Sequence, residues 1–370
     1  MKFFYTKVAL FSGVLLLPLF AGAQAPVNTN GSNANALATA VPFLNISPDS
    51  RSGAMGDAGV ALSPDVNANY WNPSKLAFIE DNDAVSISYS PWLRNLVPDI
   101  SLSYLSYAHK LDDRNTIGAS LRYFDIGSVA LTDAQGGSLG NFTPSEFSID
   151  GSIARKFGET FSLGLTVRYI HSNLSNGSAS SPNEGEKAGN ALAADVSFYY
   201  RQGGIDENQF SVGADLSNIG TKISYSTGGN AFYLPTNLKI GAANTWNSDD
   251  SQFTLTLDLN KLLVPTQPNS SVSVPAGIFQ SFTDAGLSQE FKEIYYSAGA
   301  EYWYNKTFAL RAGYYYESPD KGGRQYLTLG VGFKYQEFGF DFSYLAASQQ
   351  NSPLANTLRF TLSGSFGGTK

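Results

Sequence analysis

From residue 83 onward, the chain alternates between hydrophobic and polar positions with a period of two. In residues 253–260, Phe and Leu occupy one set of alternate positions, while Thr, Asp and Asn occupy the other. Residues 338–344 and 358–366 follow the same rule. Successive side chains of a β-strand point to opposite faces of the sheet, so each stretch predicts a strand with one apolar and one polar face.

Fourteen such stretches follow one another, and their connections alternate between short and mostly longer ones. The longest connection runs from Lys261 to Phe291. Short turns at one rim and long loops at the other are typical of bacterial outer-membrane barrels, which have an even number of strands. The pattern predicts an all-β fold, a 14-stranded antiparallel transmembrane β-barrel over residues 83–370, with both termini periplasmic. The strands are predicted near residues 85–90, 100–108, 116–124, 146–156, 161–171, 190–201, 209–217, 233–245, 252–260, 293–303, 307–316, 325–335, 337–345 and 356–366.

The first 23 residues have the pattern of a secretory signal peptide. Lys2 and Lys7 precede an apolar stretch at residues 8–20, and residues 21–23 supply the small side chains of a cleavage site. We expect the mature chain to start at Gln24. Cleavage two residues later and an uncleaved anchor helix are the alternatives, but the apolar stretch is short for a membrane span.

Residues 24–82 lack strand alternation. Residues 24–38 are rich in Asn, Ala, Ser and Gly, which is typical of a flexible leader. Residues 39–82, which we call the hatch, are rich in Gly and contain short helix-prone pieces. We expect the hatch to fold as a small N-terminal element inside the barrel lumen.

The polar positions of the predicted strands carry six basic and six acidic residues. The register must turn them into the lumen, because a Lys or Arg that faces lipid at the membrane midplane costs about 2–4 kcal/mol. Their balance favours internal salt bridges, which would hold the hatch, over an ion-selective pore. A plainer interpretation is that they only fill and solubilise the interior. The twelve lumen charges are Arg122, Asp150, Arg168, Asp195, Asp215, Lys239, Asp258, Glu301, Arg311, Lys334, Asp341 and Arg359.

Two of the predicted long loops carry apolar residues. Exposed apolar residues on a polar surface often mark interaction sites, so we take them as candidate partner-binding residues. The alternative is that they fold back over the lumen as a lid. The candidates are Trp92, Leu93 and Leu96 in the first loop, and Leu262, Leu263 and Val264 in the loop at 261–291, which continues with Ile278, Phe279 and Phe282.

The composition argues against an enzyme. The chain has no Cys, which excludes disulfides, thiol chemistry and a lipid anchor on an N-terminal Cys. His109 and His171 are far apart in the sequence, so we expect no metal site, catalytic site or cofactor. Residues 136–140 match G-x-S-x-G by letter but lack the strand-to-helix context of a nucleophile, so a flexible turn is the expectation.

The net charge argues against nucleic acid as a partner. Removal of the signal peptide takes away two lysines, so the 24 basic residues become 22 against 31 acidic residues, and the net charge becomes −9. A nucleic-acid-binding protein would need a basic face.

Three blocks of sequence resemble the PorV (LptO) family, an outer-membrane component of the type IX secretion system of Bacteroidetes. They lie at residues 41–61, 70–75 and 257–266. The block at 70–75 also recurs across the wider FadL-like barrel superfamily and is less specific. The resemblance covers the chain from about residue 37 to its C-terminus.

The resemblance implies a FadL-like barrel with an N-terminal hatch, embedded in outer-membrane lipid with its loops at the cell surface. It further implies three partners: the large translocon barrel, secreted cargo proteins with a C-terminal signal domain, and an attachment complex with a sortase-like peptidase. The implied function is a non-enzymatic shuttle that binds cargo at the translocon and carries it to the attachment complex. No functional residues carry over position by position.

Two other functions stay open. A FadL-like transporter of hydrophobic small molecules would share the fold, and Pro235 inside a predicted strand would mark an irregularity in its wall. The family is also linked to lipid A deacylation, which would require a Ser or Thr beside His109. We expect neither from the sparse apolar lining and the absent catalytic constellation.

Overall fold

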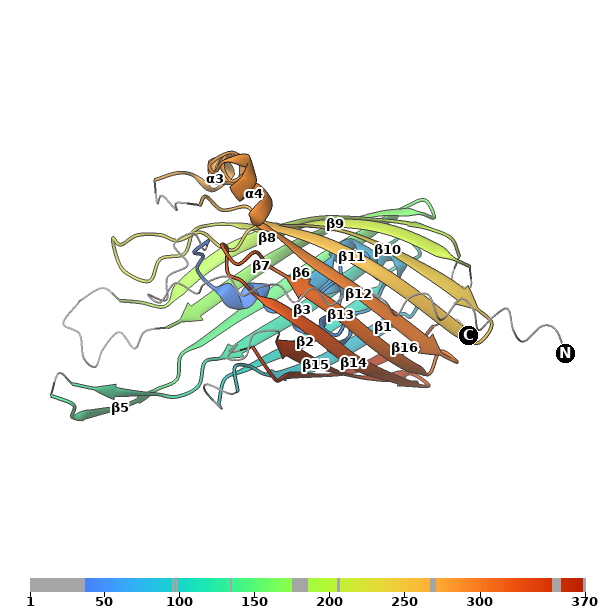
Figure 1. Ribbon diagram of the computed structural model, residues 1–370, viewed down its shortest axis with the longest axis horizontal. Coiled ribbons are helices and arrows are strands. Elements are labelled where there is room, and N and C mark those ends of the chain that lie inside the picture. The colour runs from blue at the N-terminus through green and yellow to red at the C-terminus, as the bar shows by residue number, and fades with distance from the viewer. Residues whose placement is uncertain are drawn as a thin grey trace. The chain divides into compact units, whose positions relative to one another are not determined.

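Fourteen antiparallel strands close into one barrel, as Figure 1 shows. The computed structural model describes residues 37–94, 97, 99–133, 135–174, 186–204, 207–266, 271–347 and 354–368. Consecutive barrel strands pair with each other, and β1 pairs with β16 to close the ring. The predicted fold and strand number are therefore confirmed. The predicted signal peptide and most of the predicted leader lie outside the described residues.

The barrel strands are 9 to 14 residues long. They are β1 (Asp83–Pro91), β2 (Ser101–Lys110), β3 (Asn115–Asp125), β6 (Ser145–Phe157), β7 (Phe161–Asn173), β8 (Gly189–Gln202), β9 (Gln209–Gly220), β10 (Asn237–Ser248), β11 (Ser251–Leu262), β12 (Ile294–Tyr304), β13 (Phe308–Tyr316), β14 (Gln325–Tyr335), β15 (Phe338–Ala347) and β16 (Thr357–Phe366).

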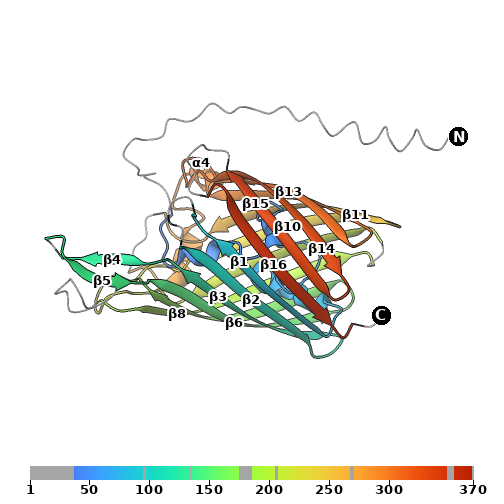
Figure 2. The same cartoon turned by 90° about the horizontal axis from the view of Figure 1, so that it is seen from below.

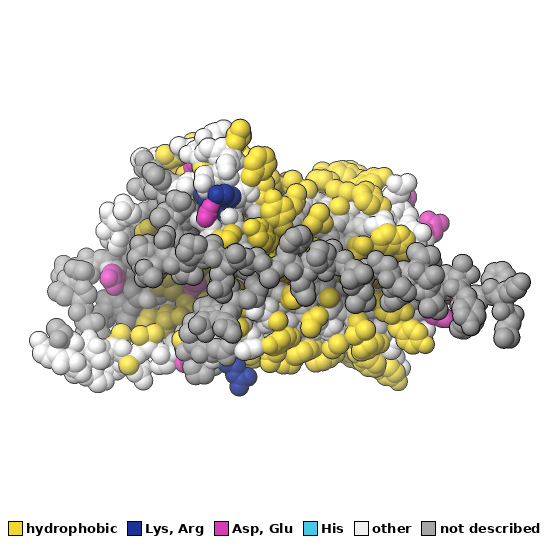
Figure 3. All heavy atoms as spheres, viewed as in Figure 1, with side chains coloured by type: hydrophobic (Ala, Val, Ile, Leu, Met, Phe, Trp, Pro, Cys, Tyr) yellow, Lys and Arg dark blue, Asp and Glu magenta, His cyan; other side chains and the backbone are white. Residues whose placement is uncertain are grey.

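The wall has an apolar outer face and a polar inner face. Along β6 and β7, exposed and buried residues alternate, and the exposed ones include Ile149, Ile153 and Leu165. Exposed hydrophobic residues of this kind form a belt around the barrel, part of which is visible in Figure 3. The belt is the surface that lipid would cover, and it leaves the polar alternate residues for the lumen.

The short connections lie at one end of the barrel, which we call the short-turn end, and the longer ones lie at the long-loop end. The connection between β10 and β11 contains residues 249–250, and that between β14 and β15 contains residues 336–337. A hairpin of β4 (Val129–Thr132) and β5 (Ser138–Phe142) extends from the long-loop end (Figure 2). This hairpin was not predicted, and Ser138 lies in its second strand rather than in a flexible turn.

The predicted strand with Pro235 is wrong at its start. β10 begins at Asn237, because a proline has no N–H to donate to the sheet. Pro235 contributes its carbonyl oxygen instead, which accepts a hydrogen bond from Asn218 Nδ2 at 3.1 Å. The irregularity in this part of the wall lies between β8 and β9, where the pairing shifts between Ala194 and Val196.

The hatch lies inside the barrel as a chain of short helical pieces. These are η1 (Pro42–Asn45), α1 (Ser50–Gly53), α2 (Ala68–Trp71) and η2 (Pro73–Phe78). Side-chain caps fix the starts of α1 and η2: Asp49 Oδ2 accepts from Ser52 N at 2.9 Å, and the Asn72 side chain accepts from Ser74 N at 3.2 Å. No helix of the described residues is long and apolar enough to cross a membrane.

Glycines in the wall let the hatch backbone approach closely. A Cβ atom on Gly313 of β13 would lie 2.0 Å from the backbone nitrogen of Gly56, where no side chain fits. Gly56 itself has a φ of 73°, in the left-handed region that favours glycine. The hatch therefore packs backbone to backbone against β13 and cannot be moved outward by a fraction of an ångström without losing this contact.

Candidate functional site: the filled lumen and the long-loop rim

One ion-pair network joins the hatch to the wall through Glu301. Glu301 on β12 is fully buried and receives Arg51 from the hatch, with Nη2 2.8 Å from Oε1. Arg311 on β13 contacts the same carboxylate, with Nε 2.6 Å from Oε2, and reaches Asp341 on β15. Arg51 also pairs with Asp65 of the hatch at 2.8 Å. A buried charge is tolerated where it is paired and hydrogen-bonded, and these groups meet that condition.

Four further wall charges hold the hatch, mostly by its backbone. Asp258 Oδ2 accepts from the backbone nitrogens of Gly59 and Val60 at 2.7 and 2.9 Å. Lys239 Nζ donates to the carbonyl oxygen of Tyr70 at 3.2 Å, and Arg122 Nη1 to that of Leu44 at 2.7 Å. Arg359 pairs with Asp57 of the hatch at 3.2 Å. Contacts of this kind fix the path of the hatch as well as its position.

The remaining charges pair within the wall. Arg168 bridges Asp150 at 2.7 Å and Asp195 at 2.8 Å. Asp215 pairs with Lys239 at 3.2 Å. These residues fill the lumen beside the hatch. Some lumen charges therefore hold the hatch, as described above, whereas others only pair within the wall and fill the interior.

Lys334 is the one predicted lumen charge that the structure leaves exposed. It lies near the turn between β14 and β15, where it lines a surface hollow with Glu337. The period-two pattern assigns Lys334 to the inner face of β14. The residue is exposed because it lies at the very end of this strand, at the short-turn end of the barrel. The other eleven are buried, or in the case of Asp341 half-buried.

The sequence alone did not predict that Asp49, Arg51 and Lys75 of the hatch form buried contacts. The hatch has no period-two alternation, so the sequence does not indicate which of its side chains point toward the wall. Asp49 Oδ1 accepts from Trp71 Nε1 at 2.6 Å. Burial, reinforced by the nearby charge of Asp65, raises the pKa of Asp49 to about 6 despite its hydrogen bonds. Burial likewise lowers the pKa of Lys75 to about 8, although its Nζ donates to the Gly59 carbonyl oxygen at 2.6 Å.

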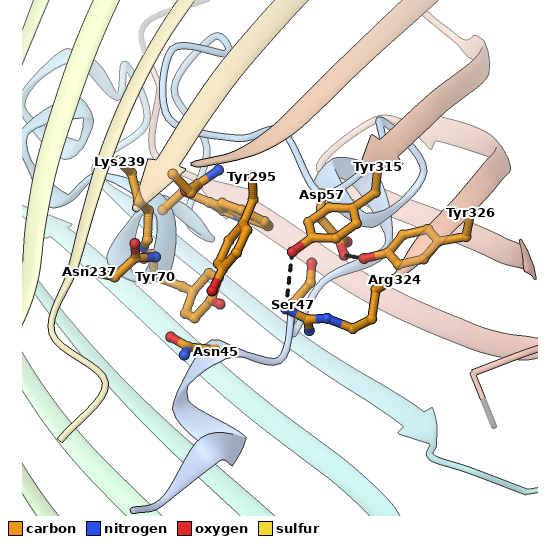
Figure 4. A pocket seen from close by; sticks show the side chains of 12 residues that line it. Asn45, Ser47, Asp57, Tyr70, Asn237, Lys239, Tyr295, Tyr315, Arg324 and Tyr326 are labelled. Carbon is orange, nitrogen blue, oxygen red and sulfur yellow. Dashed lines mark hydrogen bonds between the residues drawn. The ribbon is translucent and has the colours of Figure 1, made fainter. Parts of the chain in front are cut away.

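A small cavity remains between the hatch and the wall (Figure 4). Its volume is about 60 Å³, and Tyr295, Lys239 and Arg324 are among its lining residues. Ser47 Oγ and Asn237 Oδ1 also line it, and within the described structure neither buried atom has a hydrogen-bond partner. The cavity is polar and large enough for a few water molecules, but far below the roughly 300–1,000 Å³ of sites for drug-sized ligands.

The partner-binding candidates Leu262, Leu263 and Val264 do not form the exposed contact surface that the sequence predicted. Their exposed fractions are 7%, 3% and 0%. β11 extends to Leu262, and the chain then folds over the lumen, where Leu262 and Val264 pack in a cluster that includes Tyr233 and Tyr295. Burying each apolar side chain stabilises this arrangement by about 1.5–3 kcal/mol, which favours the lid alternative.

The candidates in the first loop are less buried than those at 262–264. Trp92 and Leu93 are half-buried just beyond β1, and Trp92 N donates to the Ile100 carbonyl oxygen at 2.9 Å. Leu93 has a φ of 51°, which is uncommon for a residue other than glycine. Leu96 lies outside the described residues. Trp92 and Leu93 remain candidates for a contact at the long-loop rim.

The most exposed apolar residues at this rim lie on two short helices, α3 (Val274–Gln280) and α4 (Leu287–Lys292). Phe279 and Leu287 are 77% and 79% exposed, and Phe291 is 66% exposed. The sequence pointed to Phe279 by composition alone. Leu287 and Phe291 were missed, although their spacing of four residues is the helical signal that could have found them.

Neither histidine belongs to a catalytic or metal cluster. His109 Nδ1 lies 2.9 Å from Asp83 Oδ1, and His171 Nδ1 lies 2.8 Å from Asn190 Oδ1. Within the part of the chain that the structure describes, no three His, Cys, Asp or Glu residues could share a metal ion.

An even-stranded antiparallel barrel with an apolar belt and a hatch in its lumen defines the class of this protein, an outer-membrane β-barrel. Solved structures with the same fold include the toluene transporter TodX of P. putida, at 12% identity and a TM-score of 0.56, with 88% of this chain and 100% of that chain covered. The monoaromatic hydrocarbon channel CymD has 14% identity and a TM-score of 0.52, with 89% and 99% covered.

The family model described as "Type IX secretion system protein PorV" matches residues 29–269. The chain belongs to the PorV family. It is a type IX secretion outer-membrane protein, as the resemblance implied, and its barrel has the same fold as TodX. No curated protein matches the sequence.

Proposed function

We propose that the chain is a non-enzymatic component of type IX secretion that binds the C-terminal signal domains of cargo at the translocon. It then passes the cargo to a surface attachment complex with a sortase-like peptidase. The match to the PorV family over residues 29–269 is the observation that carries this proposal.

The proposal includes an orientation in the outer membrane. The short turns and both termini face the periplasm, and the long loops lie at the cell surface, as is usual for bacterial barrels. In this orientation Trp92 and Leu93 lie at the cell-surface rim, where a translocon or a cargo domain would reach them. Apolar anchors of this size often dominate such contacts, some costing 2 kcal/mol or more when truncated.

A filled lumen supports a role on the outside of the barrel over a role inside it. Any solute passing through would have to displace the hatch, which Asp258 on β11, Glu301 on β12 and Arg359 on β16 hold in place. The second candidate, a transporter of hydrophobic small molecules, is favoured by the fold shared with the toluene transporter TodX. It would require a conformation in which the hatch has moved.

The test is an affinity purification of the tagged native protein in a mild detergent, with mass spectrometry of everything retained. Recovery of a very large outer-membrane barrel, or of proteins that share a C-terminal signal domain, is the expected result. Recovery of the barrel alone with a bound apolar compound would favour the transporter and contradict the proposal.

Substitutions in the first loop test the proposed contact. Trp92→Ala combined with Leu96→Ala should weaken co-purification with the translocon or the cargo without lowering the amount of folded barrel. Trp246→Ala is the matched control, because Trp246 is an exposed tryptophan of the belt near the short-turn end. Unchanged recovery of partners by the double variant would dismiss the first loop as the contact.

A further inference from the structure

The helices α3 and α4 form a knob at the long-loop rim, made up of residues 271–293, and the knob presents large apolar side chains to the outside. Figure 1 shows the two helices beside the barrel end rather than over its mouth. Phe279 on α3, Phe282 after it, and Leu287 and Phe291 on α4 are all exposed. Leu287 and Phe291 are four residues apart, so they share one face of α4.

Two acidic groups of the knob, on and just after α4, point the other way, toward the barrel. Glu290 and Glu293 are buried and both pair with Lys261 at the end of β11, at 2.9 and 2.5 Å. Glu293 also pairs with Lys321 from the next long loop at 2.8 Å. Burial opposes ionisation of Glu293, but the hydrogen bonds from the two lysines outweigh it and lower its pKa.

These pairs fix the orientation of the knob. A mobile loop could turn its phenylalanines inward, as the lid residues Leu262 and Val264 do nearby. The knob instead has its charged side anchored to the barrel and its apolar side left uncovered. Removing such side chains from water is favourable, so an occupant of this surface is favoured.

The position of the knob indicates which occupant fits. Its base joins β11 and β12, whose residues Leu257, Leu259 and Tyr296 belong to the exposed belt. Hydrophobic side chains cover parts of the knob and continue along its base toward the belt in Figure 3. An amphipathic element that continues a lipid-facing surface at the level of the rim has the design of an interfacial anchor.

We propose that the knob is a membrane anchor, with Phe279, Leu287 and Phe291 inserted into the boundary between headgroups and acyl chains of the adjacent leaflet. The ion pair between Lys292 and Asp320 remains exposed, at the level of the headgroups. The anchor would fix the rotation and tilt of the rim relative to the membrane. This proposal does not depend on the secretion function, since it concerns lipid alone.

The absence of cysteine makes the test direct. Leu287→Cys and Phe291→Cys variants of the full chain are spin-labelled in nanodiscs of phosphatidylcholine and phosphatidylglycerol. Collision with oxygen, which concentrates in lipid, is compared with collision with a water-soluble nickel chelate. Leu257→Cys in the belt serves as the lipid control and Ser138→Cys on exposed β5 as the water control. Only protein with the electrophoretic mobility of a folded barrel is measured.

Both knob labels should resemble the label at 257, with high accessibility to oxygen and protection from the nickel chelate. If both resemble the label at 138, the knob lies in water and the proposal is wrong. Protection that appears only after a protein partner is added would assign the surface to that partner and equally overturn the lipid anchor.

Discussion

The lumen and the long-loop rim use the same kinds of residue in opposite ways. In the lumen, buried charges such as Glu301, Arg311 and Asp258 bind the hatch and one another. At the rim, Glu290 and Glu293 of the knob face the barrel, and the large side chains of Phe279 and Leu287 are left exposed. The interior thus uses its charges for internal contacts, whereas the rim keeps apolar surface exposed to other molecules.

This difference separates residues that hold the structure from residues available to partners. Substitutions in the lumen should reduce stability and loosen the hatch. Substitutions of exposed apolar residues at the rim should leave the folded barrel intact and alter only what it contacts. The four predictions below test this division.

The largest effect is expected from Glu301→Gln. The variant leaves Arg51 and Arg311 buried with only part of their partners, and breaking a buried ion pair costs about 3–5 kcal/mol. Unfolding by urea, followed by tryptophan fluorescence, should show this loss, and a protease should cut the hatch faster. Glu159→Gln in an exposed short turn is the control and should change neither. Equal stability of the two variants would contradict the clasp.

Leu263→Ala compared with Phe279→Ala sharpens the division at the rim itself. Leu263 is buried, so its truncation should cost about 2–5 kcal/mol, as for other core leucines. Phe279 is exposed, and its truncation should change stability by less than about 0.5 kcal/mol. Both are measured by the same urea titration. A similar effect of the two would mean that the loop is not divided into a lid and a knob.

The hatch should be held more firmly in mild acid than at neutral pH. Burial raises the pKa of Asp49 to about 6 from an ordinary value of 3.8, so the folded state holds this proton more tightly than the unfolded state. Stability from this group is therefore full below about pH 4 and declines as the pH rises to about 6, by about 3 kcal/mol in all. Hydrogen exchange of hatch amides across this range measures it. Asp49→Asn should reduce this dependence, and an unchanged dependence in that variant would assign it to other groups.

Gly313→Ala should cost about 1–3 kcal/mol, because its Cβ atom would overlap the hatch backbone at Gly56. Gly151→Ala is the matched control, since nothing lies within 4 Å of a Cβ atom at this position on the wall. Protease sensitivity of the hatch should rise in the first variant alone. Identical behaviour of the two would place the hatch away from β13.

The alternation of the sequence was sufficient for the barrel and for the face of each lumen charge. The prediction failed for features that the alternation of side chains does not determine, such as where a strand or the lumen ends. Pro235 shows that an apolar run can stop short of a strand, and Lys334 shows that a correct face does not tell where the lumen ends. The pairing of Arg51 with Glu301 could not be predicted, because the two residues lie 250 positions apart in the sequence.

Apolar residues in loops were the least predictable feature. Val264 and Phe279 belong to the same loop and have similar hydrophobicity, yet one is fully buried and the other is largely exposed. The difference arises from the anchoring of Glu290 and Glu293 by Lys261, which fixes the loop direction. Such an arrangement depends on three-dimensional contacts that composition does not encode.

The central claim is that the barrel acts through its rim while the hatch stays in place. A double variant, Ser50→Cys with Thr361→Cys, tests it by locking the hatch to β16, since Thr361 Oγ1 lies 3.2 Å from Ser50 Oγ and the chain has no other cysteine. Binding of a purified cargo C-terminal signal domain is measured in nanodiscs before and after oxidation. The account predicts equal affinity in both states. Loss of binding on oxidation, restored by reduction, would show that the hatch must move and would contradict it.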